Sequence, residues 1–148
     1  MAADARFYEY AMAFEETYKD DDWKRLEPYF AEDAVYEVRS KHLGCVVRGR
    51  DAVLRALKKS IDGFDRRMGS RRVEVTGAPS TEGDTVSIPW AASYEYAGAP
   101  RLRFEGRSIA TVKGPHITHL VDEYTDEEAQ RMADWVTKHA PDLDASYV

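Results

Sequence analysis

The sequence has little cysteine and no long apolar run. Cys45 is the single cysteine in 148 residues, which excludes an intrachain disulfide and fits a reducing compartment. No stretch reaches about 18 apolar residues, the length that a membrane-spanning helix requires. The start, residues 1–6, leads into an aromatic and charged segment without an apolar signal core. We therefore expect a cytoplasmic protein with no membrane partner.

Several signatures of cofactor and metal chemistry are also missing. Neither a glycine-rich phosphate loop nor a Gly-x-Ser-x-Gly turn occurs. The pair His116 and His119 falls on an expected strand, where a spacing of three places the two rings on opposite faces. His42 and Cys45 lie in an expected loop and could add ligands only by an accident of folding. We expect no metal and no cofactor.

Positive charge is in deficit, which bears on nucleic-acid binding. Acidic residues number 27 against 21 basic ones, giving a net charge of −6 and a pI near 5.2. Such a surface repels nucleic acid unless a basic patch is segregated. The nearest candidates are Arg66, Arg67, Arg71 and Arg72, with no aromatic residues between them. We interpret them as a solvated helix end and strand start, and expect no nucleic-acid partner.

What the sequence does contain is the pattern of one α+β domain over residues 1–148, with a core of about 4–126. Apolar spacing and helix-start signals predict helices over residues 4–19, 23–29, 51–68 and about 126–139. Alternation between turn clusters predicts strands over residues 34–39, 71–76, 85–96, 101–112 and 117–124. Residues 40–48 should form a loop, and residues 141–148 a loose tail.

Strand parity predicts which side chains face the helices. On residues 85–96, the face that carries Trp90 is bulkier and more apolar than the face that carries Ser87. On residues 101–112, Phe104 and Ser108 share the apolar face. On the last strand, Leu120 and Tyr124 favour one face as inward. That face holds His116, Thr118, Leu120, Asp122 and Tyr124, and it leaves Ile117, His119, Val121 and Glu123 outward.

Asp122 is the main catalytic candidate, because parity places its carboxylate among aromatic side chains. Desolvation would raise its pKa into the range of a general acid or base. An aspartate at a strand end can equally pair with an arginine or cap a backbone group, and both interpretations stay open. Tyr36 and Tyr10 could donate hydrogen bonds into the same space, although a buried tyrosine commonly satisfies its hydroxyl locally. The expected apolar walls are Phe14, Leu57, Ile61, Trp90, Phe104, Leu120 and Tyr124.

Two runs carry a family resemblance. The run from Trp23 to Val38 and the run Arg48-Gly49-Arg50-Asp51-Ala52-Val53 resemble the nuclear transport factor 2-like superfamily. That superfamily includes the SnoaL-like cyclases, ketosteroid isomerase and limonene epoxide hydrolase. The resemblance reaches from the first helix to Asp126. It implies a cone-shaped, cystatin-like roll, in which a bent and mostly antiparallel sheet wraps on N-terminal helices around a small-molecule pocket, with an extra C-terminal helix.

The match to ketosteroid isomerase lacks that enzyme's catalytic groups. Its tyrosine acid falls on Phe14, its aspartate base falls on Val38, and its second acid falls near Ser108. These departures argue against steroid isomerisation by that mechanism. They leave the three positions as expected pocket residues.

The match to limonene epoxide hydrolase retains two positions. That enzyme's pocket tyrosine matches Tyr36, and one of its catalytic aspartates matches Asp122. Its remaining catalytic positions fall on Val38, Trp90 and Ala92, so its water-activating trio is incomplete here. SnoaL-like cyclases use an aspartate at a place similar to Asp122, which makes theirs the resemblance that survives best.

Two functional hypotheses follow from these matches. The first is an acid/base enzyme of SnoaL-like type that isomerises, cyclises or dehydrates an apolar or aromatic molecule, with Asp122 moving the proton and Tyr36 orienting the substrate. The second is a non-catalytic ligand-binding or association module, which the apolar replacements favour. An open cavity beside Asp122 would support the enzyme, and a filled one with Asp122 in a salt bridge would support the module.

A homodimer is a separate expectation from the outer face of the sheet. Small residues alternate there with charged ones, which would give a polar, self-complementary twofold contact. The residues concerned are Ser87, Ala91, Ser93, Arg101, Arg103, Glu105 and Arg107.

Overall fold

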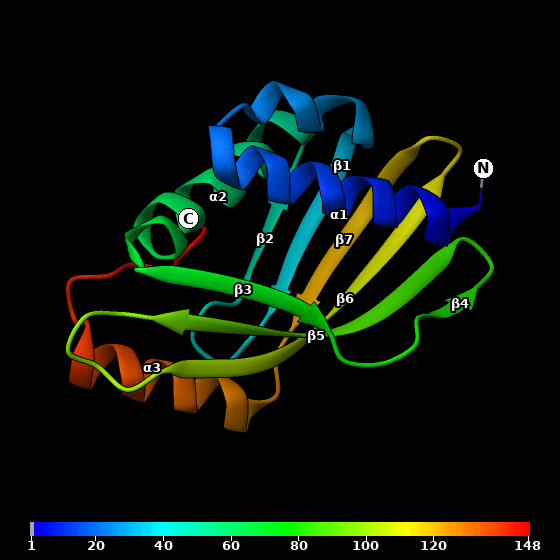
Figure 1. Ribbon diagram of the computed structural model, residues 1–148. Coiled ribbons are helices and arrows are strands. Elements are labelled where there is room, and N and C mark those ends of the chain that lie inside the picture. The colour runs from blue at the N-terminus through cyan, green and yellow to red at the C-terminus, as the bar shows by residue number, and fades with distance from the viewer. Residues whose placement is uncertain (1) are drawn as a thin grey trace.

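The computed structural model describes residues 2–148, and its elements follow the predicted order (Figure 1). The helices are α1 (Ala3–Asp20), α2 (Arg50–Gly63) and α3 (Asp126–His139), with two 3₁₀ segments, η1 (Trp23–Tyr29) and η2 (Asp65–Arg67). The strands are β1 (Phe30–Arg39), β2 (Cys45–Arg48), β3 (Ser70–Val75), β4 (Ser80–Glu82), β5 (Thr85–Glu95), β6 (Leu102–Lys113) and β7 (His116–Glu123). In the described residues, no helix is long and apolar enough to cross a membrane.

One curved sheet organises these elements. Its strand order is β2-β1-β7-β6-β5-β3, and β4 pairs with the other end of β5. Only β1 and β7 run parallel; every other pairing of described strands is antiparallel. Helix α1 contacts β5 and β6, α2 contacts β1, and α3 packs against β6 with Met132 reaching the same side of the sheet as α1 and α2 (Figure 1). The predicted α+β class, with N-terminal helices and an extra C-terminal helix, is confirmed.

The buried side chains form two apolar clusters instead of one continuous core. The first cluster joins α1, η1 and β1 to residues of β5, β6 and β7, and it includes Tyr10, Phe30 and Tyr36. The second joins the end of α2 to β5, β6 and α3 and includes Phe64 and Phe104. Burial in each helix follows the three- and four-residue spacing that predicted it. The space between the clusters becomes the cavity described below.

The helix expected over residues 51–68 ends early. Helix α2 stops at Gly63, and the chain continues through the separate 3₁₀ turn η2. In this turn the carboxylate of Asp65 accepts hydrogen bonds from Arg71 and Tyr94. The apolar spacing runs on to Met68, which is buried although it lies beyond the helix.

Two segments expected as loop or turn contain short strands. In the expected loop at 40–48, β2 pairs with the edge of β1, and in the expected turn at 80–84, β4 pairs with β5. Both cover strand edges that would otherwise leave backbone groups unpaired. Pro89 lies on β5 between the stretches that pair with β3 and β4, so its missing N–H removes no ladder bond on that side.

A bulge changes the expected parity at the start of β7. The pairing with β6 shifts between Thr111 and Val112, so Ile117 and His119 oppose neighbouring residues of β6. As a result Ile117, predicted to face outward, is fully buried in the first cluster, while His116 is exposed. The shift is typical of a β-bulge, in which one extra residue rotates the following side chains. Beyond it, Leu120, Asp122 and Tyr124 face inward as predicted.

The C-terminal residues are not the loose tail that the sequence predicts. The hydroxyl of Ser60 donates to the carbonyl of Ala145 at 2.7 Å, and the Asp144 N–H donates to the carbonyl of Gly63 at 3.0 Å. Leu143 is buried in the second cluster. Chain termini stay poorly ordered unless they are tied down, and these contacts with α2 tie this one down.

Small residues on the outer face of the sheet are covered within the chain itself. Ala91 is fully buried and Ser93 nearly so. Long charged side chains stand directly opposite them on the neighbouring strands, and they form a network of ion pairs. The network contains Arg72, Glu74, Arg103 and Glu105. A contact between two copies at this face would therefore be made by charged groups, not by the small residues.

Candidate functional site

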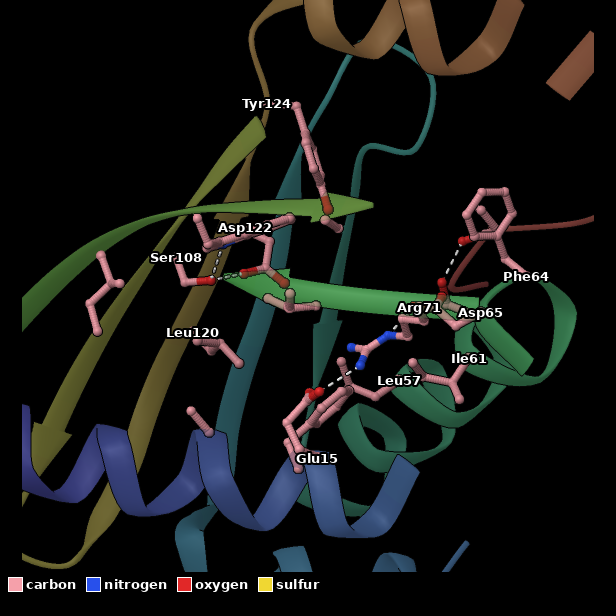
Figure 2. A pocket seen from close by; sticks show the side chains of 18 of the residues that line it. Glu15, Leu57, Ile61, Phe64, Asp65, Arg71, Ser108, Leu120, Asp122 and Tyr124 are labelled. Carbon is pink, nitrogen blue, oxygen red and sulfur yellow. Dashed lines mark hydrogen bonds and ion pairs between the residues drawn. The ribbon is translucent and has the colours of Figure 1, made fainter. Parts of the chain in front are cut away.

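A cavity of about 240 Å³ lies between the sheet and helices α1 and α2 (Figure 2). Its volume is below the roughly 300–1,000 Å³ of drug-sized sites, which suits a small ligand. Tyr8, Val73 and Val75 line it and remain 37%, 40% and 54% exposed, so its mouth lies between α1 and β3. Apolar side chains at a mouth favour entry of an apolar molecule.

The structure brings nearly all of the predicted site residues to this cavity. The residues that line it are Tyr10, Phe14, Tyr36, Leu57, Ile61, Trp90, Phe104, Ser108, Leu120, Asp122 and Tyr124. Val38 does not line it. That side chain is 3% exposed and packs in the first cluster, on the part of β1 that pairs with Cys45. Val38, the position on which the aspartate base of ketosteroid isomerase falls, is therefore a core residue.

Asp122 lies deep in the protein, and the surface that it keeps accessible faces the cavity. Its Oδ2 accepts a hydrogen bond from the Tyr36 hydroxyl at 2.6 Å, and its Oδ1 accepts one from the Ser108 hydroxyl at 2.5 Å. Ser108 stands directly opposite Asp122 in the β6–β7 ladder. On the adjacent β1, Val38 is the register partner of Asp122, and Tyr36 lies two residues before it. The register of the sheet therefore sets the positions of Asp122, Ser108 and Tyr36.

Trp90 fixes the direction of the Ser108 bond. The indole Nε1 donates to Ser108 Oγ at 2.9 Å. An indole N–H can only donate, so the serine oxygen accepts from Trp90 and its own proton points to Asp122. Asp122 thus receives two donors with set directions, which favours its ionised form.

Burial opposes these two hydrogen bonds. Desolvation is the largest influence and raises the pKa of Asp122 above 3.8, while the bonds from Ser108 and Tyr36 lower it in part. The pKa of Tyr36 is raised well above 10.0 by burial and by the charge of Asp122, so its hydroxyl stays protonated and donating. The carboxylate is therefore a stronger base than an exposed aspartate, with both supporting protons held in place.

Tyr147 is a cavity residue that sequence reasoning missed. The C-terminal tail carries it to the cavity wall, where its ring packs edge-on against Tyr36 with 5.4 Å between centroids. Burial and the charge of Asp122 raise the pKa of its phenol. Tyr147 adds a third hydroxyl near the carboxylate. The sequence carries no signal for this, because the tail's position depends on contacts with α2.

A second polar cluster on the cavity wall was also missed. Arg71 Nε donates to Asp65 Oδ2 at 2.8 Å, and its Nη1 donates to Glu15 Oε1 at 2.6 Å. The Tyr94 hydroxyl donates to Asp65 Oδ2 at 2.9 Å, and the guanidinium lies 4.4 Å from the centre of the Tyr18 ring. Figure 2 shows Arg71 held between Glu15 and Asp65. The three residues come from three different elements, β3, α1 and η2.

Two sequence signals could have found this cluster. Asp65 continues the four-residue spacing of Leu57 and Ile61, so it is an acid on an apolar helix stripe. Arg71 shares strand parity with Val73 and Val75, and all three line the cavity. The interpretation of Arg71 as part of a solvated patch is wrong, because its side chain is only 7% exposed.

Ionisation in this cluster is set by opposing effects. Burial raises the pKa of Asp65, and the charge and hydrogen bonds of Arg71 and Tyr94 oppose that rise. The pKa of Arg71 is raised by Glu15 and Asp65 against the effect of burial, so the guanidinium stays charged. Within residues 2–148, no group of three His, Cys, Asp or Glu side chains is arranged to hold a metal ion.

Comparison with known proteins assigns a family. The sequence pattern of the SnoaL-like domain matches residues 6–120, well over half of the chain. This chain belongs to the SnoaL-like domain family. Among curated proteins, no sequence matches it. The match includes Tyr36 and Ser108, whereas Asp122, Tyr124 and Tyr147 of this SnoaL-like domain lie beyond it.

Solved structures support the same fold. A protein of unknown function with a cystatin-like fold from Xanthomonas campestris has a TM-score of 0.65 at 17% identity, with 91% of this chain and 98% of that chain covered. TerC, crystallised with polyporic acid, has a TM-score of 0.64 at 13% identity, with 89% and 98% covered.

A third structure is a hypothetical protein with a ketosteroid isomerase-like fold from Catenulispora acidiphila, in complex with trimethylamine. Its TM-score is 0.59 at 21% identity, with 86% of the SnoaL-like domain described here and 96% of that chain covered. At these identities the likeness establishes the fold. The match to the SnoaL-like domain over residues 6–120 confirms the predicted superfamily.

Proposed function

We propose that this SnoaL-like domain is an acid/base enzyme of isomerase, cyclase or dehydratase type that acts on a small apolar or aromatic substrate. One observation carries the proposal. The carboxylate of Asp122 faces the cavity, has a pKa raised by burial, and is held by Tyr36 and Ser108. A perturbed carboxylate in a cavity is a typical general base.

Each residue near Asp122 has a part in this proposal. Asp122 removes a proton from a carbon of the substrate and returns it to another atom. Ser108 keeps the carboxylate oriented, and Tyr36 orients both the carboxylate and the substrate. The aromatic walls position a flat ring against Asp122, since Trp90 and Tyr124 stand edge to face with 5.7 Å between ring centroids.

The alternative is a non-catalytic module that only binds ligands. Two features favour the enzyme over it. A cavity lies beside Asp122, and no arginine, lysine or histidine of residues 2–148 forms a salt bridge with its carboxylate. Structures of related fold contain trimethylamine or polyporic acid, which supports a small-molecule ligand under either alternative.

A general probe of proton removal can test the catalytic proposal without the natural substrate. The probe is 5-nitrobenzisoxazole, a small aromatic molecule. A carboxylate takes its ring C–H proton, the N–O bond breaks, a nitrile forms, and a coloured phenolate is released. Turnover is followed by absorbance, and binding is followed separately by quenching of tryptophan fluorescence.

We expect Asp122→Asn to lower kcat for this probe by about 100-fold or more, the range of general acid–base catalysis. The melting temperature should stay unchanged or rise, because a costly buried charge is removed. Asp142→Asn is the matched control, since Asp142 is an exposed carboxylate paired with Arg67. Equal turnover by the wild type and Asp122→Asn would contradict the catalytic proposal, and binding without turnover would favour the module.

Two further expectations belong with this proposal. We propose that the protein forms a homodimer through the charged outer face of the sheet, where Arg103 pairs with Glu74 and Glu105. We also propose that it works in the cytoplasm, which the unpaired thiol of Cys45 supports.

A further inference from the structure

We infer that Arg71 is a second ligand-binding residue of the cavity, and that the ligand is a neutral aromatic molecule carrying a carbonyl or a similar hydrogen-bond acceptor. The inference rests on the proposed function in one respect, namely that a small molecule occupies the cavity beside Asp122. It adds the chemical class of that molecule and the group that binds its polar end.

The guanidinium of Arg71 keeps one donor atom without a partner in residues 2–148. Arg71 uses Nε for Asp65 and Nη1 for Glu15. Its Nη2 makes no hydrogen bond to any group of residues 2–148, although the side chain is only 7% exposed and lines the cavity. Nη2 is not among the fully buried unpaired side-chain atoms of these residues, so it keeps accessible surface and can donate to a ligand oxygen in the cavity.

The guanidinium of Arg71 is also held firmly in one orientation. Asp65 and Glu15 bind it from two sides, and the Tyr18 ring lies 4.4 Å from it. Tyr94 in turn fixes Asp65. Figure 2 shows the guanidinium pointing into the cavity, toward the wall that carries Asp122. A donor fixed in this way loses little entropy when it binds a ligand.

Arg71 and Asp122 lie on different strands of the cavity wall. Arg71 begins the same face of β3 as Val73 and Val75, the apolar residues at the cavity mouth, so it lies just inside the entrance. Asp122 lies on β7, which is separated from β3 by β6 and β5. A ligand that reaches both residues must cross the cavity between them. The wall along that path is aromatic, formed by Trp90, Tyr94, Phe104 and Tyr124.

The charges around Arg71 favour a neutral hydrogen-bond acceptor over an anion as the ligand. Arg71 is already matched by Glu15 and Asp65, so it offers a directional donor with no net positive charge to spare. Asp122 adds a further carboxylate to the same cavity. A carboxylate ligand would bring another negative charge into low dielectric, where like charges repel strongly. A ketone, quinone or ester oxygen gains the hydrogen bond without that repulsion.

Three probes of matched shape test the ligand class. These are 4-fluoroacetophenone, 4-fluorobenzoate and 4-fluoro-α-methylstyrene, which present a neutral acceptor, an anion and no acceptor on the same ring. Dissociation constants are measured by fluorine NMR on the full chain. In the wild type we expect the ketone to bind about tenfold or more tightly than the alkene, as a hydrogen bond to a charged donor provides. The benzoate should bind more weakly than the ketone.

Variants then test whether Arg71 is the donor. Removing Arg71 alone would leave Asp65 buried and unpaired, so the double variant Asp65→Asn/Arg71→Met replaces both charges together and leaves no donor at position 71. It should bind ketone and alkene equally. Asp65→Asn alone is the matched control and should keep the preference for the ketone. Glu15→Gln, at a half-exposed position, removes one negative charge and should improve benzoate binding several-fold relative to the ketone.

The outcomes separate this inference from the proposed function. Asp122→Asn should retain the ketone preference even though it loses turnover. Equal binding of ketone and alkene by the wild type, tightest binding of benzoate, or no binding of any probe would overturn the inference. So would a preference that disappears in Asp122→Asn but survives in the double variant. If the ketone preference holds while Asp122→Asn still turns over 5-nitrobenzisoxazole, only the proposed function fails.

Discussion

At the residue scale, Asp122 is the product of two opposed influences. Burial disfavours its charge, and donors from Tyr36 and Ser108 favour it. Because Trp90 occupies the Ser108 oxygen, the serine proton has a set direction. The carboxylate is thus kept charged enough to act as a base yet basic enough to hold a proton after taking one.

This balance predicts how stability depends on pH. The folded-state pKa of Asp122 is raised above 3.8, so the folded protein binds this proton more tightly than the unfolded chain does. Stability from the protonated group is therefore full below about pH 3.8, and it is lost as pH rises through the raised pKa. Asp122→Asn removes that loss. We expect the free energy of unfolding of the variant, relative to wild type, to increase from acid to neutral pH.

Urea unfolding at a series of pH values measures this difference. Asp65 has a pKa shifted in the same direction, but it is present in both proteins and cancels. Asp142→Asn again serves as the control, and its difference from wild type should not follow this curve. A difference between Asp122→Asn and wild type that stays flat with pH would mean that Asp122 titrates as an exposed aspartate does.

At the scale of elements, the C-terminal tail completes the cavity. It crosses α2 at Gly63, where an added Cβ would come within 2.1 Å of the Asp144 carbonyl oxygen. Glycine at this position is what allows the two backbones to touch. The tail then places Tyr147 against Tyr36, so a close backbone approach at one end of α2 determines part of the wall around Asp122.

We predict that Gly63→Ala displaces the tail. The added methyl cannot fit without a backbone shift, so stability should fall by about 1–3 kcal/mol, the usual cost of overpacking. The amide hydrogen of Asp144 should exchange faster, because its bond to the Gly63 carbonyl is lost. Val148→Ala, at a side chain 75% exposed, is the control and should change neither quantity. Wild-type stability and exchange in Gly63→Ala would mean that the tail does not pack on α2.

At the scale of the whole molecule, a network of ion pairs covers the small residues on the outer face of the sheet. Arg103 bridges Glu74 and Glu105, and the small Ala91 lies beneath them fully buried. Any association at this face must pair charges across a twofold axis, which makes it sensitive to ionic strength.

We predict a homodimer at micromolar concentration in low salt, with a smaller dimer fraction in high salt because screening weakens exposed ion pairs. Light scattering coupled to size exclusion measures it. Arg103→Glu, which reverses one charge of the network, should weaken the dimer, whereas Lys24→Glu on η1 is a control outside this face. A monomer in both salt conditions would rule out the proposed contact.

Much of the candidate site could be predicted from local pattern. Alternation along a strand sets which side chains share a face whatever the strand pairs with, so Trp90, Ser108 and Asp122 were placed inward correctly. The same reasoning failed at Ile117, because a bulge depends on how two strands pair and cannot be recognised in the sequence of one strand.

The sequence by itself determined the order of helices and strands, the α+β class and the inward face of most strands. These follow from periodicity within a dozen residues, where the physics is local. Tertiary structure alone decided that Glu15, Asp65 and Arg71 meet on one cavity wall and that Tyr147 returns to Tyr36. Such contacts join residues far apart in the chain. Their formation depends on packing and on the pairing of buried charges, which no single segment specifies.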